Sequence, residues 1–117
     1  MLQHAGIEVK PADLDETVAF FSILGFSLVP DPFDGGFTWL ECGGTQIHLM
    51  HEDAPVVPPR AHVAIVCPQI DAALARLQEH GFEVERRREQ WGEPRAIAIA
   101  PGGHRVELMK APPPRAA

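Results

Sequence analysis

The stretch Gly43-Gly44-Thr45-Gln46-Ile47-His48-Leu49-Met50 aligns without gaps with Gly102-Gly103-His104-Arg105-Val106-Glu107-Leu108-Met109. Each copy has two glycines, an apolar residue in the fifth place, a side chain that can bind a metal in the sixth place, and Leu-Met at its end. His4 lies 44 residues before His48, and His62 lies 45 residues before Glu107. A repeat of this kind fixes the architecture as well as the residues. The sequence therefore predicts two copies of one unit, with four potential ligands at equivalent places.

The segments around the repeat predict the same order of elements in both copies. Short β-branched runs after His4 and His62 are typical of strands, and apolar residues at spacings of three and four follow each run, as in amphipathic helices. Gly25 and Gly81 end these helical patterns. In the first copy we expect a strand at 4–9, a helix from 14 with Asp13 as its N-cap, and strands at 27–31, 36–42 and 45–51. In the second copy we expect a strand at 62–67, a helix from 70, and strands at 82–88, 94–100 and 104–110.

The predicted fold class is therefore α+β, with two tandem βαβββ modules. They are expected to form a curved, mostly antiparallel sheet that encloses a cleft, with the helices outside. The first module spans 1–51 and the second 61–110. Residues 52–60 read as a Pro-rich linker, because proline has no backbone donor for a sheet ladder. Residues 111–117 are predicted to form a disordered tail.

Composition narrows the classes of partner. The chain has 117 residues, 45% of them apolar, and a net charge of −6, which argues against nucleic acid or an anionic membrane as partner. No apolar run approaches the roughly 20 residues needed to span a bilayer, and the N-terminus lacks a signal-peptide pattern. Cys42 and Cys67 fall on the apolar side of their strands, so we expect buried, reduced cysteines and a cytoplasmic protein.

Strand alternation predicts the direction of the four ligand candidates, because successive side chains point to opposite faces of a sheet. In each of the four strands the candidate lies opposite the apolar set, for example His48 opposite Ile47 and Leu49. The apolar face must pack on the helices, so the candidates should share the inner face. The same alternation places further side chains there as a candidate substrate pocket: Trp39, Phe37, Gln46, Met50, Arg105 and Met109.

The donor set suits a divalent cation. Neutral imidazoles and a carboxylate bind Zn, Ni, Fe, Co or Mn, and the residues alone do not select among them. Each candidate taken singly could be an ordinary solvated strand residue, so the prediction rests on their joint placement. His48 has two readings: it is a fourth ligand, or it contacts substrate and acts as a catalytic residue in proton transfer.

At these residues the chain resembles the vicinal oxygen chelate superfamily, which includes glyoxalase I, extradiol dioxygenases, methylmalonyl-CoA epimerase, fosfomycin-resistance enzymes and bleomycin-resistance proteins. The resemblance covers about 4–110 and rests on HAGIEV from His4, LGF at 24–26, HVAI at 62–65 and PGGHRVEL at 101–108. It implies that His4, His48, His62 and Glu107 meet around one divalent metal. Glyoxalase I has a carboxylate where this chain has His48, which weakens a glutathione-dependent glyoxalase assignment. The short C-terminal end likewise speaks against a fosfomycin enzyme.

The resemblance implies a metalloenzyme that chelates and polarises two vicinal oxygens of a small substrate, with lyase, isomerase or ring-cleaving oxygenase chemistry. The alternative is a metal-free binding protein of the bleomycin-resistance type, which sequesters an aromatic or cationic molecule. Relatives of that type have lost metal ligands, and none of the four is lost here, which favours the enzyme. Family members of this length are homodimers, so a homodimer is expected.

Overall fold

The computed structural model describes residues 1–115, which fall into two compact units. The first unit comprises Met1–Pro59 together with the turn Pro101–Gly103. The second unit comprises Arg60–Ala100 and the chain from His104 onward. Each unit contains one sheet and one α-helix.

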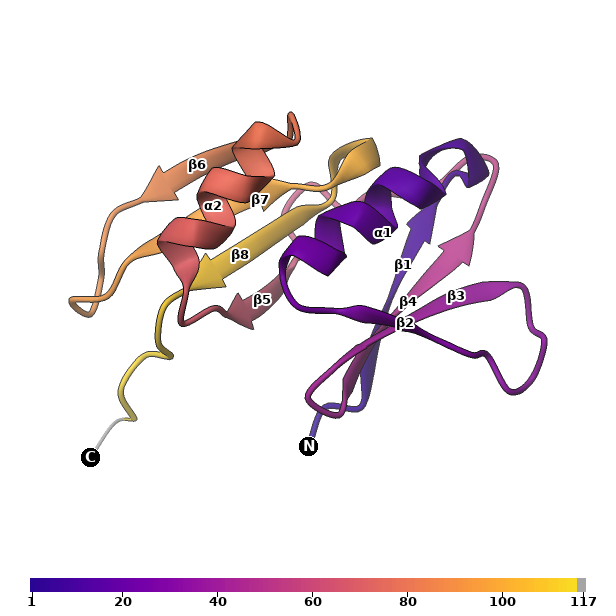
Figure 1. Ribbon diagram of the computed structural model, residues 1–117, viewed down its shortest axis with the longest axis horizontal. Helices are drawn as coiled ribbons and strands as arrows, with labels where there is room; N and C mark the ends of the chain where they lie inside the picture. Colours follow the sequence, from indigo (N-terminus) through magenta and orange to yellow (C-terminus); the bar gives the residue numbers. More distant parts are fainter. Residues whose placement is uncertain (116–117) are drawn as a thin grey trace. The chain divides into compact units, whose positions relative to one another are not determined.

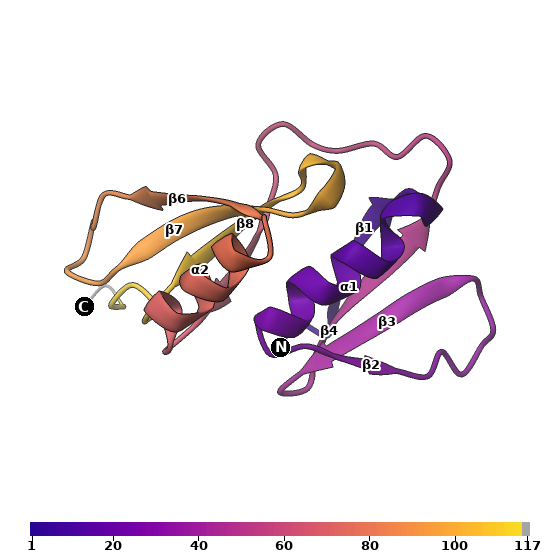
Figure 2. The same ribbon diagram turned by 45° about the horizontal axis from the view of Figure 1, so that its top comes forward.

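The first unit is a four-stranded sheet with a helix on one face (Figures 1 and 2). Its elements are β1 (His4–Val9), η1 (Pro11–Asp13), α1 (Leu14–Ile23), β2 (Ser27–Val29), β3 (Phe37–Cys42) and β4 (Thr45–His51). The strand order is β1-β4-β3-β2. β1 pairs with β4 in parallel, and the other two pairs are antiparallel. The helix between β1 and β2 supplies the crossover that the parallel pair requires.

The second unit repeats this arrangement. Its elements are β5 (Val63–Val66), α2 (Ile70–Glu79), β6 (Glu83–Arg87), β7 (Arg95–Ile99) and β8 (Arg105–Met109). The turn η2 (Pro101–Gly103), which connects β7 to β8, belongs to the first unit. The order is β5-β8-β7-β6, again with one parallel pair, β5 with β8. The predicted α+β class with two βαβββ modules is confirmed, and each sheet is mostly antiparallel.

One face of each sheet is buried under the helix. In the first unit Phe20 and Phe21 of α1 are fully buried, as are Leu40 and Leu49 of the sheet. In the second unit Leu77 of α2 and the strand residues Ala96, Ala98 and Leu108 are also fully buried. Burial of such side chains is worth roughly 1.5–3 kcal/mol each for the larger ones, so this layer is the main source of stability in each unit.

The two helices end in the same way, which extends the repeat to backbone detail. Gly25 and Gly81 both have a positive φ, of 96° and 90°. In each case the next residue donates back to a carbonyl one turn earlier, Phe26 to Phe21 at 3.0 Å and Phe82 to Leu77 at 2.9 Å. This is the Schellman end, for which glycine is favoured because it has no Cβ to clash.

Several element boundaries differ from the predicted ones. The strand expected at 27–31 ends at Val29, because Pro30 cannot donate a ladder hydrogen bond and Asp31 begins a turn. Asp13 occupies the N-cap of α1 as predicted, but its side chain makes no capping hydrogen bond. Instead the Thr17 hydroxyl donates to the Asp13 carbonyl at 2.7 Å. The other predicted strands agree to within one residue at each end.

The prediction of two buried cysteines is wrong for Cys42. Cys42 is exposed, because it is the last residue of β3, where the chain turns into β4. Cys67 is half-buried, and burial raises the pKa of its thiol. The two thiols are free and form no disulfide.

The connecting segments carry no helix or strand. This holds for the linker 52–60, where the backbone N–H of Val56 donates to the Glu8 carboxylate at 3.1 Å. It also holds for 111–115 of the predicted tail, while residues 116–117 lie outside the described part of the chain. Within the described residues, no helix has the length and apolar character needed to cross a membrane.

Candidate functional site

The open face of the first sheet carries a stack of three rings. His48 of β4 lies opposite Trp39 of β3 and Gly6 of β1 in the strand register. Its imidazole is parallel to the Trp39 ring on one side, at 4.3 Å between centroids, and to the His4 ring on the other, at 4.1 Å. His48 is only 7% exposed, although it lies on the face away from the helix. The predicted common face of these three residues is therefore observed.

A chain of hydrogen bonds holds the edge of the His48 ring. Nε2 of His48 is 2.8 Å from the side-chain oxygen of Gln46, two residues earlier on the same strand. The side-chain nitrogen of Gln46 donates in turn to the Glu41 carboxylate at 3.0 Å. Glu41 is the direct cross-strand partner of Gln46, so the sheet register itself places the three groups in order.

A short loop between β2 and β3 brings an acid and an aromatic ring to this face. The Asp31 carboxylate accepts backbone hydrogen bonds from Phe33 at 2.8 Å and Gly35 at 2.9 Å, which closes the loop. The hydrogen bond from Phe33 is the main cause that lowers the pKa of Asp31, and the charge of His48 lowers it further. Phe33 is 79% exposed, and its ring is tilted against Trp39 at 6.1 Å.

The surroundings of His48 favour its neutral form. Burial is the largest cause that lowers the pKa of His48, and the neighbouring His4 lowers it further. The charge of Asp31 acts in the opposite direction without reversing the shift. A neutral imidazole keeps one bare ring nitrogen, which is the form that accepts a proton or binds a metal.

The second unit presents one imidazole and one carboxylate. His62 directly precedes β5, and its Nδ1 lies 2.8 Å from the carbonyl oxygen of Arg60. Because a carbonyl only accepts, Nδ1 carries the proton and Nε2 keeps its lone pair. Glu107 of β8 forms an ion pair with Arg95 of β7 at 3.5 Å, and the two side chains are 14% and 16% exposed. Arg95 also lies over the Trp91 ring at 5.8 Å.

The two units place their donors in the same relation. His4 is two residues before Gly6, which is the register partner of His48. His62 is two residues before Ala64, which is the register partner of Glu107. Each pair therefore lies diagonally across a parallel strand pair, on the face opposite the helix. No group of three His, Cys, Asp or Glu side chains within either unit, over residues 1–115, could hold a metal ion.

The predicted pocket residues lie on these same faces. Phe37 pairs with Met50 in the register, and the end of the Met50 side chain lies so close to Gly6 that a Cβ there would come within 3.2 Å of it. In the second unit, Arg105 and Met109 flank Glu107 on β8 and share its face. Gln46, also predicted, is the residue bonded to His48.

A family model of the Glyoxalase/Bleomycin resistance protein/Dioxygenase superfamily matches residues 2–108, nearly the whole of the two-module chain. The chain belongs to this superfamily. Its members often use divalent metals, bind small molecules and often dimerise. No curated protein matches the chain.

Several solved structures share the fold of this chain. A glyoxalase family protein from Bacillus anthracis is 26% identical over 93% of both chains, with a TM-score of 0.81. The oxidase ChaP-H2 is 21% identical, with 97% of this chain and 94% of the other covered and a TM-score of 0.77. TnmS3, an antibiotic binding protein from Streptomyces sp. CB03234, is 24% identical over 93% of both chains, with a TM-score of 0.70.

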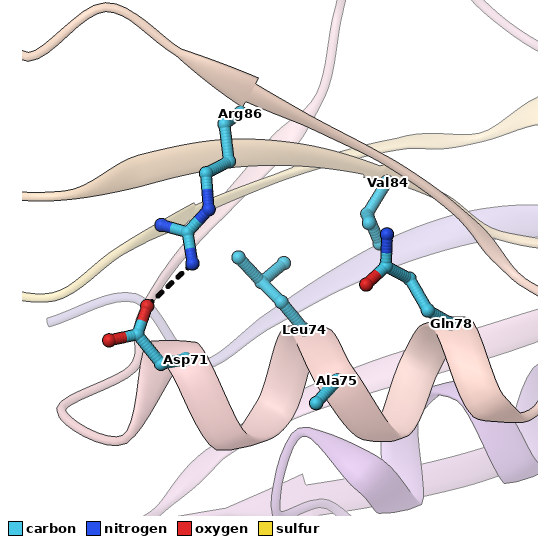
Figure 3. A pocket seen from close by; sticks show the side chains of 6 residues that line it. All are labelled: Asp71, Leu74, Ala75, Gln78, Val84 and Arg86. Atoms are coloured by element: carbon cyan, nitrogen blue, oxygen red, sulfur yellow. Dashed lines mark hydrogen bonds and ion pairs between the residues drawn. The ribbon is translucent and has the colours of Figure 1, made fainter.

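A pocket of about 390 Å³ lies in the second unit, between α2 and the edge strand β6 (Figure 3). Leu74 and Val84 line it, and the ion pair between Arg86 and Asp71, at 2.6 Å, spans one end. It lies on the helix side of the second sheet, so it contains none of the predicted site residues.

Three side chains near the site were not predicted from the sequence: Asp31, Glu41 and Arg95. The Asp31-Pro-Phe-Asp-Gly-Gly segment is a recognisable turn signal, but a turn signal does not say which face the loop covers. Glu41 could have been found, because alternation along 36–42 puts it on the same face as Trp39. Arg95 required the register between β7 and β8.

The shifted pKa of His48 leads to a prediction for the metal-free protein. The pKa of His48 in the folded protein lies below its ordinary value of about 6.5. As the pH falls through that value, the unfolded chain therefore binds more protons than the folded protein does. The free energy of unfolding should therefore fall between pH 8 and pH 5.5. His48→Phe, which keeps a ring in the stack, should lose less over this window in urea denaturation at matched pH values. Asp31 stays ionised throughout, since its pKa is lowered from 3.8. Identical pH slopes for the two proteins would show that His48 is not the group responsible.

Proposed function

We propose that the protein is a metal-dependent enzyme that binds a small substrate through two vicinal oxygens, with lyase, isomerase or dioxygenase-type chemistry. The observation that supports this most strongly is the repeated diagonal placement of His4 with His48 and of His62 with Glu107. Four residues of unrelated role have no physical reason to share this geometry. A binding site assembled from two equivalent halves would explain why they share it.

The donor chemistry fits a divalent ion of the borderline class, such as Zn, Ni, Fe, Co or Mn. His62 has a bare Nε2, because its Nδ1 is engaged by a carbonyl. The Nδ1 of His4 is engaged by the Gln3 side chain, so its Nε2 is the nitrogen offered to a metal. Glu107 supplies a largely buried carboxylate. Catalytic metal sites commonly use three protein ligands, and we assign this role to His4, His62 and Glu107.

We assign the fourth predicted ligand, His48, to the substrate instead. Both faces of its ring are covered by His4 and Trp39, and its Nε2 is engaged by Gln46. Only Nδ1 is left to interact, and a neutral imidazole there can accept a proton from a substrate carbon or oxygen. A bound metal would supply Lewis-acid polarisation of the substrate oxygens. The exposed rings of Phe33 and Phe37 offer apolar surface beside these groups.

The second candidate is a metal-free protein that sequesters a planar aromatic or cationic molecule. It is favoured by the exposed Phe33 ring, which is tilted against Trp39 beside the Asp31 carboxylate. An aromatic surface next to a negative charge attracts such ligands through stacking and cation–π contacts. A measurement of metal binding decides between the two candidates, because the sequestering protein does not require a metal and the enzyme does.

The metal assignment is tested by titrating Ni²⁺ or Zn²⁺ into metal-free protein purified without a His-tag. Glu107→Gln should weaken affinity by more than the roughly 10–100-fold that loss of an outer-sphere partner costs. Glu83→Gln is the matched control, because Glu83 is an exposed carboxylate on the same face of the same sheet. His48→Phe should keep the wild-type affinity. Equal affinity in Glu107→Gln and the control would refute the metal site, and loss in His48→Phe would return that residue to the metal ligands.

We further propose that the protein is a homodimer with two equivalent sites, located in the cytoplasm. The three assigned ligands come from both units, His4 from the first and His62 and Glu107 from the second. The ion therefore needs a unit of each kind, supplied within one chain or between two. Sedimentation velocity at micromolar concentration should give a dimer mass. A monodisperse monomer that binds metal would overturn the dimer and leave the metal assignment standing.

A further inference from the structure

The hydrogen-bond chain on the open face of the first sheet has a direction that its chemistry fixes. It runs from the Glu41 carboxylate through the Gln46 amide to Nε2 of His48, with contacts of 3.0 Å and 2.8 Å. A carboxylate only accepts hydrogen bonds, so the Gln46 NH₂ group must face Glu41. The amide oxygen must then face His48. An amide oxygen also only accepts, so Nε2 of His48 must be the donor.

We propose that Glu41 and Gln46 are positioning residues that fix the proton of neutral His48 on Nε2 and leave Nδ1 bare. On the proposed function, His48 lies against the substrate, and its bare Nδ1 is the atom that would accept a proton there. Without Glu41, the Gln46 amide could rotate and present its NH₂ group to the ring. The tautomer of His48 would then no longer be determined.

The other two histidines of the proposed site show why this control matters. In His62 a backbone carbonyl accepts from Nδ1, which produces the opposite tautomer with Nε2 bare. In His4 the partner of Nδ1 is the side-chain amide of the preceding residue, Gln3, which is exposed. His62 and His48 therefore present different ring nitrogens, Nε2 and Nδ1, and the difference is set by their hydrogen-bond partners. The ring planes of His4 and His48 are parallel, so stacking alone does not distinguish their edges.

The register explains why the chain is built from these positions. Glu41 and Gln46 are direct partners across the antiparallel pair β3 and β4, and their side chains therefore lie on one face about 5 Å apart. Trp39 and His48 are the next such pair along the same face. Trp39 thus stacks on the plane of the His48 ring, and Gln46 bonds to its edge. The two contacts come from neighbouring cross-strand pairs on one face of the sheet.

The test is ¹⁵N NMR of the imidazole nitrogens in metal-free protein at pH 8, where histidine is neutral. In the wild type His48 should show a protonated Nε2 and a bare Nδ1, while His62 in the same spectrum shows the reverse. Gln46→Lys replaces the acceptor by a donor and should change the tautomer ratio of His48 at least about tenfold toward protonated Nδ1, since a satisfied bond is exchanged for two opposed donors. Gln3→Lys is the matched control, with the same change beside His4, and should leave His48 unchanged.

Two further variants keep the test decisive where Gln46→Lys does not fold. Gln46→Glu retains an acceptor and should retain the wild-type tautomer. Glu41→Met removes the group that orients the amide and should move the ratio toward that of free histidine. A wild-type His48 with protonated Nδ1, or a ratio that none of these folded variants changes, would overturn the proposal. Because the readout is the ring itself, loss of the metal or substrate assignment would not produce either result.

Discussion

The alternation of side chains along a β-strand is the constraint on which the candidate site depends. Each module buries one face of its sheet under a helix, and every second residue of its strands is thereby committed to the other face. A shift of one residue in the pairing of β1 with β4 would turn His48 into the apolar layer. The fully buried Leu49, which neighbours His48 on β4, opposes that shift, because Leu49 would then move to the open face. The core of each module therefore determines to which face its two candidate site residues point.

The ring stack shows how the open face is made rigid without a second apolar layer. Trp39, His48 and His4 come from three adjacent strands, and their parallel rings leave His48 almost completely enclosed. Enclosure disfavours a charged imidazole, and the adjacent His4 adds to this effect. Asp31 opposes it from the β2–β3 loop, which is itself closed by two backbone hydrogen bonds to that carboxylate. The result is a neutral imidazole whose ring plane and ring edge are both held.

The sequence was sufficient to predict the fold because the repeat supplied what single strands lack. The GG…Leu-Met pattern set the frame of β4 and β8, and alternation from that frame gave the common face of His48 and Trp39 correctly. Local chemistry limited the rest. Pro30 shortened β2, the hairpin exposed Cys42, and the ion pair of Glu107 with Arg95 depends on a cross-strand register that composition does not reveal. The Glu41–Gln46–His48 chain was within reach of the pattern, but its atoms and direction required the structure.

The proposed function requires that the two modules contribute ligands to one ion. The most direct measurement is titration of metal-free protein with Co²⁺, monitored by the paramagnetic shifts of the imidazole protons. Signals of His4 and His62 should shift together and reach their end point at one ion per chain. Shifts confined to the histidine of one module, or separate end points for the two, would contradict it.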